Sequence, residues 1–404
     1  MYSQYLHFKI LNRFYTFSDL ILVKEGSPYF KYAISKTSLN VILIIIFSVG
    51  IASTVIILSR KFHELHRDKF YFLFVLFFTL VCSGGCFLSG YFQLGRNIDP
   101  MDYSNSYSYI YNYKTYDVPN KTMQISGLYD SVFHGLLHYL TTNNKDKTKE
   151  SQNYVSNYLK NHPQKELTAN DYTGKFKDKN IIVVLMESID SYLVNEKVMP
   201  TLYKLSQEGL NFTNRYSPSF GGGQTINSEF ALNTGLYSPN NGTIYDFENT
   251  YKTSLANKFK NEGYSTASIH FNHGYYYNRS IFHSNLGFDN HYSLLDMDNI
   301  NRNKHNYEYD SNLIKSSKTF DLIVRKNKYL TFITTYSAHL PYNTSENKKC
   351  SDNKYKLKGD SEEMTCIYNL ARDTDEMIRL LIDKLQKMNQ LDNTVLVLAS
   401  DHYM

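Results

Sequence analysis

The sequence lacks tryptophan and carries little net charge. Its 404 residues include 43 Lys and Arg against 38 Asp and Glu, which gives a formal net charge of +5. A charge this small, with no dense basic stripe, argues against a nucleic-acid partner and weakly favours an anionic lipid surface. The 37 tyrosines accompany many asparagines and lysines, so we interpret them as compositional bias and base no function on them.

A cleavable signal peptide is also lacking, because residues 1–36 are mixed where a basic start should lead directly into an apolar stretch. Two uncharged apolar runs follow, at residues 37–59 and 70–95. Each exceeds the roughly 20 apolar residues that cross a bilayer, and buried core helices rarely run this long without a polar face. We therefore expect a membrane region at residues 1–95 with two transmembrane helices.

The loop between the two runs indicates their orientation. It contains Arg60, Lys61, Arg67 and Lys69, and an excess of basic residues in a short loop is typical of the cytoplasmic side. The rest of the chain is then expected outside, as part of a multi-pass protein of the cell membrane. Because a chain that starts outside needs a translocation signal, we also expect earlier spans ahead of residue 1.

The cysteines are few and fall into two pairs. Cys82 and Cys86 lie in the second predicted span, whereas Cys350 and Cys366 would share the outer compartment. Two thiols in an oxidising compartment could form a disulfide. The sequence leaves this pairing open.

Residues 96–175 are polar and rich in Tyr and Asn, with one amphipathic stretch at residues 123–140. We interpret this segment as an extracytoplasmic linker. After it, short apolar runs alternate with helical stretches. Length and branched residues predict buried strands at residues 180–186, 265–271, 329–336 and 394–400.

Helical stretches lie between these runs. Proline near the start, glycine at the end and apolar residues at helical spacing predict helices within residues 200–209, 251–263 and 362–388. Alternating strands and helices favour an α/β fold, with a mostly parallel sheet and helices on both faces. The fully apolar strands predict burial on both sides of that sheet.

A titratable or metal-binding side chain follows each predicted strand. In a parallel sheet, ligands bind beyond the carboxyl ends of the strands. One such residue is usually a solvated loop residue, but four strands ending this way favour a common site. These residues are Glu187; His270, with Arg279 in the next loop; His339; and Asp401 with His402.

Two carboxylates and an imidazole form an oxygen-rich site that suits a divalent cation such as Mn, Mg or Zn. The stretch "SFGGGQTINSEF" at residues 219–230 supplies a hydroxyl group next to it. Its three glycines allow close approach of the backbone to a ligand, and Thr225 lies at a predicted helix start that favours an anion. A metal ion bound to this hydroxyl would make it a nucleophile.

Five motifs in order resemble one family. "IIVVLMES", "SFGGGQTINSEFALNTGLY", "HFNHGYYYNRSIFHSNLGFD", "SAHLPY" and "ASDHY" are similar to motifs of the lipoteichoic acid synthase-like phosphoglycerol transferases. These enzymes of the cell envelope belong to the sulfatase and alkaline phosphatase superfamily. The resemblance covers residues 176–404, which implies a sulfatase-like catalytic domain there. Family members usually have more spans before this domain and more chain after "DHY", so we expect both ends to be incomplete.

The resemblance implies a role for each site residue. It places a metal ion, usually manganese, on Glu187, Thr225, Asp401 and His402, with Thr225 as the nucleophile. Other residues would contact the substrate. Arg279 would bind the glycerophosphate, and His339 would lie near the phosphate and the leaving group. His270 matches a histidine of the same pocket. The family aromatic residue two positions before the arginine is here Tyr277.

The reaction implied is a transfer in two steps. Thr225 attacks the phosphorus of phosphatidylglycerol, diacylglycerol leaves, and an acceptor hydroxyl then takes the glycerophosphate group. The acceptor stays open between a glycerophosphate polymer, a glycolipid primer and a glycan.

Three other functions are alternatives to phosphoglycerol transfer. The first is a sulfatase, which needs Cys or Ser two residues before a proline and an arginine two residues after that proline. The order around Pro218 is Tyr-Ser-Pro-Ser-Phe, so this signature is absent there and a sulfatase is not favoured. A phosphoethanolamine transferase uses the same threonine chemistry, although Arg279 favours glycerophosphate. A catalytically inactive membrane-anchored binding protein is the third alternative.

Overall fold

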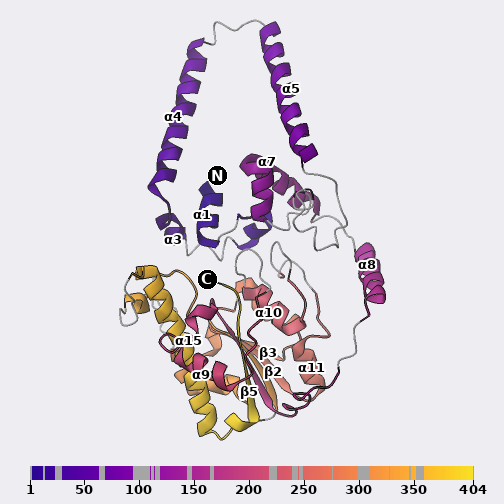
Figure 1. Cartoon of the computed structure of the whole chain (residues 1–404), viewed down its shortest axis with the longest axis vertical. Coiled ribbons are helices and arrows are strands. Elements are labelled where there is room, and N and C mark those ends of the chain that lie inside the picture. Colours follow the sequence, from indigo (N-terminus) through magenta and orange to yellow (C-terminus); the bar gives the residue numbers. More distant parts are fainter. Residues whose placement is uncertain are drawn as a thin grey trace. The chain divides into compact units, whose positions relative to one another are not determined.

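The structure is a computed structural model. It separates into two compact units, Met1–Asn144 and Lys145–Met404 (Figure 1). The residues described are 2–11, 14–22, 30–62, 69–93, 110, 113, 119–142, 148–163, 168–217, 225–238, 244, 249–274, 276–298, 309–326, 328–344, 347–351 and 359–403.

The first unit is helical in its described residues. Mostly apolar residues form its two long helices. The predicted amphipathic stretch forms the last helix, which bends at Gly127, where φ is 73°. The α-helices are α1 (Tyr2–Leu11), α3 (Phe30–Ser35), α4 (Leu39–Phe62), α5 (Lys69–Gln93) and α7 (Pro119–Thr142), with a 3-10 helix, η1 (Phe17–Leu22).

Within the described residues, one helix has the length and composition of a membrane span. This is α4, whose 19-residue stretch Leu39–Ile57 is 0% buried. In α5 the apolar stretch Leu73–Gly85 is shorter, and residues 94 and 95 of the predicted second span lie outside the described residues. One candidate span is therefore found, and the second span and the multi-pass topology stay predictions.

The second unit contains a five-stranded sheet in the order β3-β2-β4-β1-β5, and every described strand pair is parallel. The sheet confirms the predicted α/β class. The strands are β1 (Asn180–Met186), β2 (Ser265–His270), β3 (Asn290–Tyr292), β4 (Tyr329–Thr334) and β5 (Thr394–Ser400).

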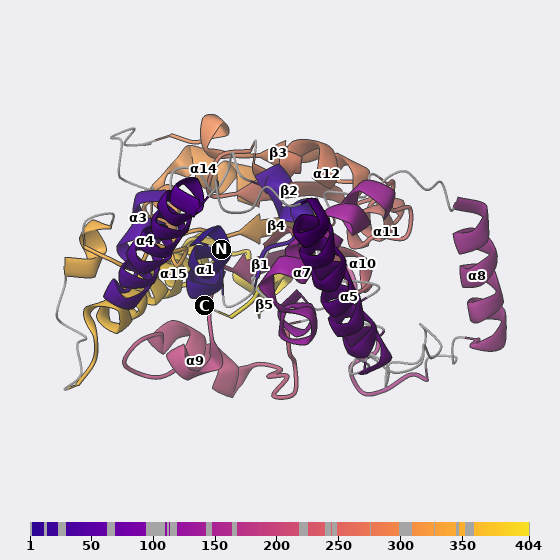
Figure 2. The same ribbon diagram turned by 90° about the horizontal axis from the view of Figure 1, so that it is seen from above.

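Helices cover both faces of this sheet. Figure 2 shows α9, α14 and α15 on one side and α10, α11 and α12 on the other. The bounds are α8 (Thr148–Asn161), α9 (Pro200–Glu208), α10 (Thr225–Thr234), α11 (Leu255–Asn261), α12 (Arg279–Asn285), α13 (Asp310–Lys315), α14 (Ser317–Ile323) and α15 (Glu362–Lys387), with 3-10 helices η5 (Ser191–Leu193), η7 (Tyr276–Asn278), η8 (Leu294–Asp296), η9 (Lys348–Ser351) and η10 (Leu391–Asn393).

Successive residues of the central strands enter opposite cores, because side chains alternate across a strand. Ile182 and Val184 of β1 pack with α9, α13, α14 and α15, whereas Val183 and Leu185 pack with α10, α11 and α12. The expectation that all strands are buried on both sides is wrong for β5, where Val397 is 41% exposed. This strand is the edge of the described sheet, so one flank has no neighbouring strand.

The structure also settles the open cysteine pairing. Cys350 of η9 and Cys366 of α15 form a disulfide across a sequence separation of 16. Cys82 is a free cysteine. The strand β3 was not predicted, because its three residues, Asn-His-Tyr, have no apolar alternation.

Candidate active site

Strand register brings the two predicted acidic ligands together. β1 pairs with β5 in parallel, with Met186 opposite Ser400, so Glu187 and Asp401 follow neighbouring strand ends. The Asp401 amide donates to the Met186 carbonyl at 3.1 Å, which continues the ladder past the strands. Both side chains are buried, Glu187 at 3% and Asp401 at 0% exposed.

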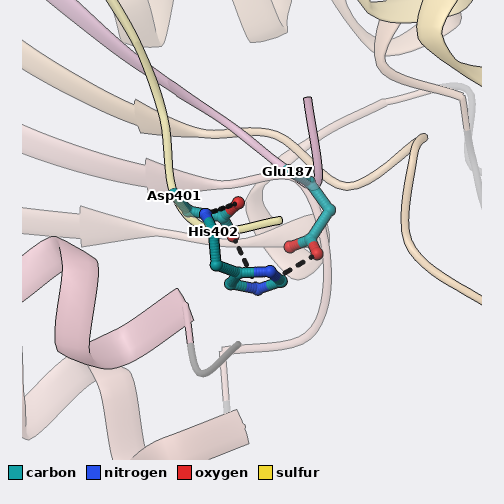
Figure 3. Close-up of side chains that lie close together, drawn as sticks. All are labelled: Glu187, Asp401 and His402. Atoms are coloured by element: carbon teal, nitrogen blue, oxygen red, sulfur yellow. Dashed lines mark hydrogen bonds and ion pairs between the residues drawn. The ribbon is translucent and has the colours of Figure 1, made fainter. Parts of the chain in front are cut away.

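His402 completes a group of three side chains (Figure 3). One ligand atom from each of Glu187, Asp401 and His402 lies within 4.8 Å of the others. His402 Nε2 is 3.1 Å from Asp401 Oδ2 and 3.6 Å from Glu187 Oε1. His402 Nδ1 lies 2.8 Å from the Tyr403 carbonyl, so in the neutral ring Nδ1 carries the proton and Nε2 has the lone pair.

Thr225 adjoins this group from α10, whose first residue it is. The side chain is 7% exposed, and its Oγ1 donates to Glu187 Oε2 at 3.1 Å. Thr225 is therefore helical, and the residues just before it lie outside the described part of the chain. The glycines of the "GGGQT" motif lie outside the described residues, and their close approach to a ligand stays a prediction.

Two buried acids dominate the electrostatics of this group. Burial lowers the pKa of His402, but Asp401 and Glu187 outweigh burial and raise it above its usual value. Burial and the neighbouring Glu187 carboxylate raise the pKa of Asp401 to about 7. Burial also disfavours the charge on Glu187, but His339 and His402 with hydrogen bonds from Ser188 and Thr225 bring its pKa below the usual value. Two buried carboxylates this close repel each other.

The donor set fits a divalent cation. Asp401 Oδ2 is buried and accepts no hydrogen bond within the described part of the chain, although His402 Nε2 is close by distance. A buried carboxylate oxygen without such a partner is costly, and a neutral imidazole lone pair beside it is a metal ligand. Glu187, Asp401 and His402 could therefore hold one metal ion.

Two residues that the sequence reasoning missed orient these ligands. Ser188 has a left-handed backbone, with φ at 51°, and donates from its amide to Asp401 Oδ1 and from its hydroxyl to Glu187 Oε1, both at 2.8 Å. The Thr335 hydroxyl accepts the Glu187 amide at 2.9 Å. A non-glycine residue with positive φ between two ligand contacts is local strain of the kind found at functional sites.

His339 lies after β4 and is half-buried. Its ring stacks on Tyr336 with centroids 4.9 Å apart, and its Nδ1 is 2.7 Å from the Leu340 carbonyl. Nδ1 therefore carries the proton in the neutral ring, and Nε2 is the nitrogen that accepts or donates a second proton. Its charge is among the influences that lower the pKa of Glu187.

A buried carboxylate anchors the loop that carries His339. Asp310 accepts the amides of Tyr336 and Ser337, each at 2.9 Å. Burial raises the pKa of Asp310 to about 6. The start of this loop is therefore fixed to α13, one more contact that the sequence pattern did not reveal.

Arg279 lies in a second buried group. It follows two residues in the left-handed region, Tyr277 and Asn278, and is 2% exposed. Its Nε donates to Glu229 at 3.0 and 3.1 Å, and Nη1 is 3.3 Å from His270 Nδ1. Nη2 of Arg279 donates no hydrogen bond within the described ranges, so its two N–H groups are available to bind an anion.

Glu229 is the residue that sequence reasoning missed here. It is 0% exposed and also accepts from His283 Nε2 at 3.1 Å and from Thr334 Oγ1 at 2.6 Å. Burial disfavours its charge, but Arg279 and His283 more than compensate and lower its pKa. Its spacing of four residues from Thr225 predicts the same face of a helix, and this was the available signal.

Histidine 270 is held neutral in this group. Burial and the neighbouring Arg279 charge lower its pKa well below the usual value. His270 and Arg279 are therefore brought together as expected, in contact with each other and with the Glu229 group. The structure thus brings Glu187, Thr225, Asp401 and His402 together in one group and His270 and Arg279 together in a second, and no hydrogen bond in the described part of the chain joins His339 to either.

The chain is similar to several known proteins. A family model described as Sulfatase matches residues 179–404, more than half of the chain. The chain belongs to the sulfatase family. Within the family, it is 29% identical to the lipoteichoic acid synthase of Staphylococcus aureus over 274 residues, which are 65% of this chain and 42% of that protein. The enzyme of Staphylococcus saprophyticus is 28% identical over the same shares.

The resemblance expected from the five motifs is thus confirmed, although the chain spans less than half the length of these relatives. The crystal structure of the lipoteichoic acid synthase LtaP from Listeria monocytogenes superposes with a TM-score of 0.53 and 22% identity, covering 62% of each chain. At that identity the likeness shows the fold of a sulfatase family member.

Proposed function

We propose that this sulfatase family member is a metal-dependent phosphoglycerol transferase with Thr225 as its nucleophile. The observation that carries the proposal is the hydrogen bond from Thr225 Oγ1 to Glu187 Oε2, beside the Glu187, Asp401 and His402 group. A divalent cation on these residues, manganese by preference with Mg or Zn as alternatives, would lower the pKa of the hydroxyl and offset phosphoryl charge.

In the first step, Thr225 Oγ1 would give its proton to Glu187 Oε2, to which it already donates. It forms a bond to the phosphorus of phosphatidylglycerol while the bond from phosphorus to the diacylglycerol oxygen breaks. The Nη2 donors of Arg279 would bind a phosphoryl oxygen as charge develops. His339 Nε2 would give a proton to the departing diacylglycerol oxygen. His270, in contact with Arg279, would help to line the same pocket.

In the second step, a hydroxyl of the acceptor attacks the phosphorus, the bond from phosphorus to Thr225 Oγ1 breaks, and Thr225 takes its proton back from Glu187. His339 Nε2 would take the proton of that hydroxyl, the reverse of its first role. The acceptor would be a glycerophosphate polymer or a glycan. Phosphoryl transfer depends mainly on positioning and charge stabilisation, which these residues can supply.

A membrane location would keep this site near its lipid donor. The candidate span α4 supports anchoring in the cell membrane, with residues 176–404 as a catalytic domain on the extracytoplasmic side after the linker at residues 96–175. The proposal also includes the second predicted span and a multi-pass topology.

Diacylglycerol release tests the donor and the nucleophile together. Membranes containing the protein are supplied with fluorescent phosphatidylglycerol and Mn²⁺, and wild type is compared with Thr225→Ala. We expect metal-dependent release that falls at least about a thousandfold in the variant, as for loss of other catalytic nucleophiles. Thr234→Ala is the matched control, because Thr234 lies on the same helix and donates only to the Phe230 carbonyl.

Release that survives Thr225→Ala would exclude the threonine mechanism. Release from phosphatidylethanolamine and not from phosphatidylglycerol would identify the alternative phosphoethanolamine transferase. No release from either lipid by a protein that still binds a stoichiometric metal ion would favour an inactive binding protein.

A further inference from the structure

The second half of α7 exposes its large apolar side chains. These residues recur every three or four positions, so they share one face of the helix. A helix of a water-soluble domain would bury such a face. The residues and their exposed fractions are Tyr129 76%, Phe133 64%, Leu136 36%, Leu137 44% and Leu140 54%, and we call them the apolar face of α7.

The opposite face of α7 is small or polar and is already covered by protein. Ser131 is 6% exposed and Gly135 is buried. Both face the segment at residues 14–17 across a cavity of about 20 Å³. The Phe14 amide donates to Asn120 Oδ1 at 2.9 Å. The helix therefore has the reverse of the usual arrangement, with its apolar residues outward.

Hydrogen bonds connect α7 to the start of the candidate span. The segment at residues 14–17 that contacts α7 is joined to α1 because Gln4 donates to the Tyr15 carbonyl at 3.0 Å and accepts its amide at 2.8 Å. The hydroxyls of Tyr2 and Thr37 are 2.6 Å apart, and α4 begins at Leu39. The first unit therefore couples α7 to the point where α4 would enter a bilayer.

The bend at Gly127 separates residues 128–142 as a straight segment. Gly127 has φ 73° and ψ 173°, outside the helical range. Fifteen helical residues span about 22 Å, less than the roughly 30 Å hydrocarbon core of a bilayer. A segment of this length with one apolar face is suited to lie in the membrane interface rather than to cross it.

We propose that residues 128–142 form an interfacial helix whose apolar face inserts into the lipid leaflet at which α4 begins. The occupant of this face is the boundary between phospholipid headgroups and acyl chains. Continuity with α4 carries this assignment, because the same unit exposes an apolar stretch of span length that is 0% buried. The proposal does not depend on the catalytic activity.

The lack of tryptophan makes a direct test simple, since one introduced tryptophan is the only indole in the chain. The full-length chain with Phe133→Trp is reconstituted in vesicles of phosphatidylcholine and phosphatidylglycerol that contain lipids brominated at different depths of the acyl chain. Phe47→Trp on α4 is the positive control, and Phe212→Trp in the second unit, where Phe212 is 77% exposed, is the aqueous control.

We expect fluorescence of Phe133→Trp to be shifted to the blue and quenched, most strongly by bromines near the headgroup. Phe47→Trp should be quenched most strongly by deeper bromines. Leu137→Trp, on the same face, gives a second reading if the first variant folds poorly by circular dichroism.

Quenching at both positions no greater than for Phe212→Trp would overturn the proposal. Protection from aqueous iodide without quenching by brominated lipid would assign the face to a protein partner and overturn it too. Maximal quenching by the deepest bromines would contradict the interfacial orientation.

Discussion

Glu187 and Glu229 are both buried acids at one edge of the sheet, but their surroundings are opposite. Glu229 accepts hydrogen bonds from Arg279, His283 and Thr334, and its pKa is lowered. Glu187 faces a second carboxylate, Asp401, whose pKa rises to about 7 and whose Oδ2 accepts no hydrogen bond in the described part of the chain.

The difference indicates what each group requires. The Glu229 group balances its own charge with an arginine, so folding alone completes it. The Glu187 group has an excess of acceptors, so we expect a cation to complete it. Thr225 and Glu229 lie one turn apart on α10, which places the proposed nucleophile between an arginine that can bind an anion and a group that can bind a metal ion.

The largest expected effect follows from breaking the balanced group. Arg279→Met leaves the Glu229 charge buried without its main partner, and breaking a buried ion pair in this way costs about 3–5 kcal/mol. The free energy of unfolding of the full-length protein in detergent, compared with wild type, measures it. Lys328→Met is the control, because its ion pair with Asp178 is exposed and should contribute less than about 1 kcal/mol.

Adding Glu229→Gln to Arg279→Met should recover part of the loss, since the unpaired charge is then removed. Equal small losses for Arg279→Met and Lys328→Met would contradict the assignment of a buried, balanced group.

The two groups should also respond to pH with opposite sign in protein stripped of metal. The folded-state pKa of Asp401 is raised from 3.8 to about 7, so its contribution relative to Asp401→Asn is greatest below the unfolded value and is lost as pH rises through about 7. A shift of this size corresponds to at most about 4 kcal/mol. The coupled Glu187 carboxylate reduces the net effect.

For Glu229 the folded-state pKa is lowered from 4.5. Its contribution relative to Glu229→Gln is therefore complete above the unfolded value and is lost as pH falls below it. Unfolding measured across this range for wild type and both variants gives the two differences. Slopes of the same sign would mean that the two carboxylates do not differ as described.

A smaller effect is expected from one hydroxyl of the balanced group. Thr334→Val removes the donor to Glu229 Oε1 and keeps the side-chain shape, and a hydrogen bond to a charged group contributes about 1.5 kcal/mol at the low end. Thr334→Ser, which retains the hydroxyl, is the matched control in the same unfolding measurement. A loss in Thr334→Val no larger than that in Thr334→Ser would mean that the hydroxyl contributes no more than the methyl group, and would contradict this estimate.

The closeness of Glu187, Asp401 and His402 could be predicted from the sequence, because each follows a strand and parallel strands end on the same side of a sheet. That they hold a metal ion stays a prediction. This rule alone was enough to predict that Glu187, Asp401 and His402 lie close together. It did not reveal Glu229 as the partner of Arg279, since a contact across 50 residues depends on how α10 and α12 pack. Ser188 was missed for another reason, because nothing in its neighbours marks a positive φ.

The apolar strand patterns predicted the bounds of the strands better than their burial. The apolar runs at 180–186 and 394–400 match β1 and β5 at both ends, but the same pattern in β5 did not tell an edge strand from a central one. Burial depends on which strands are neighbours, and that information is not local.

Metal content of the full-length protein tests the contrast between the two groups most directly. Protein in detergent is stripped with a chelator, dialysed against a small excess of Mn²⁺ and then against buffer, and the metal bound per chain is measured by mass spectrometry of the ions. The account predicts stoichiometric metal in wild type and in Glu229→Gln and little in Asp401→Asn. Wild type without metal, or metal lost from Glu229→Gln and kept by Asp401→Asn, would contradict it.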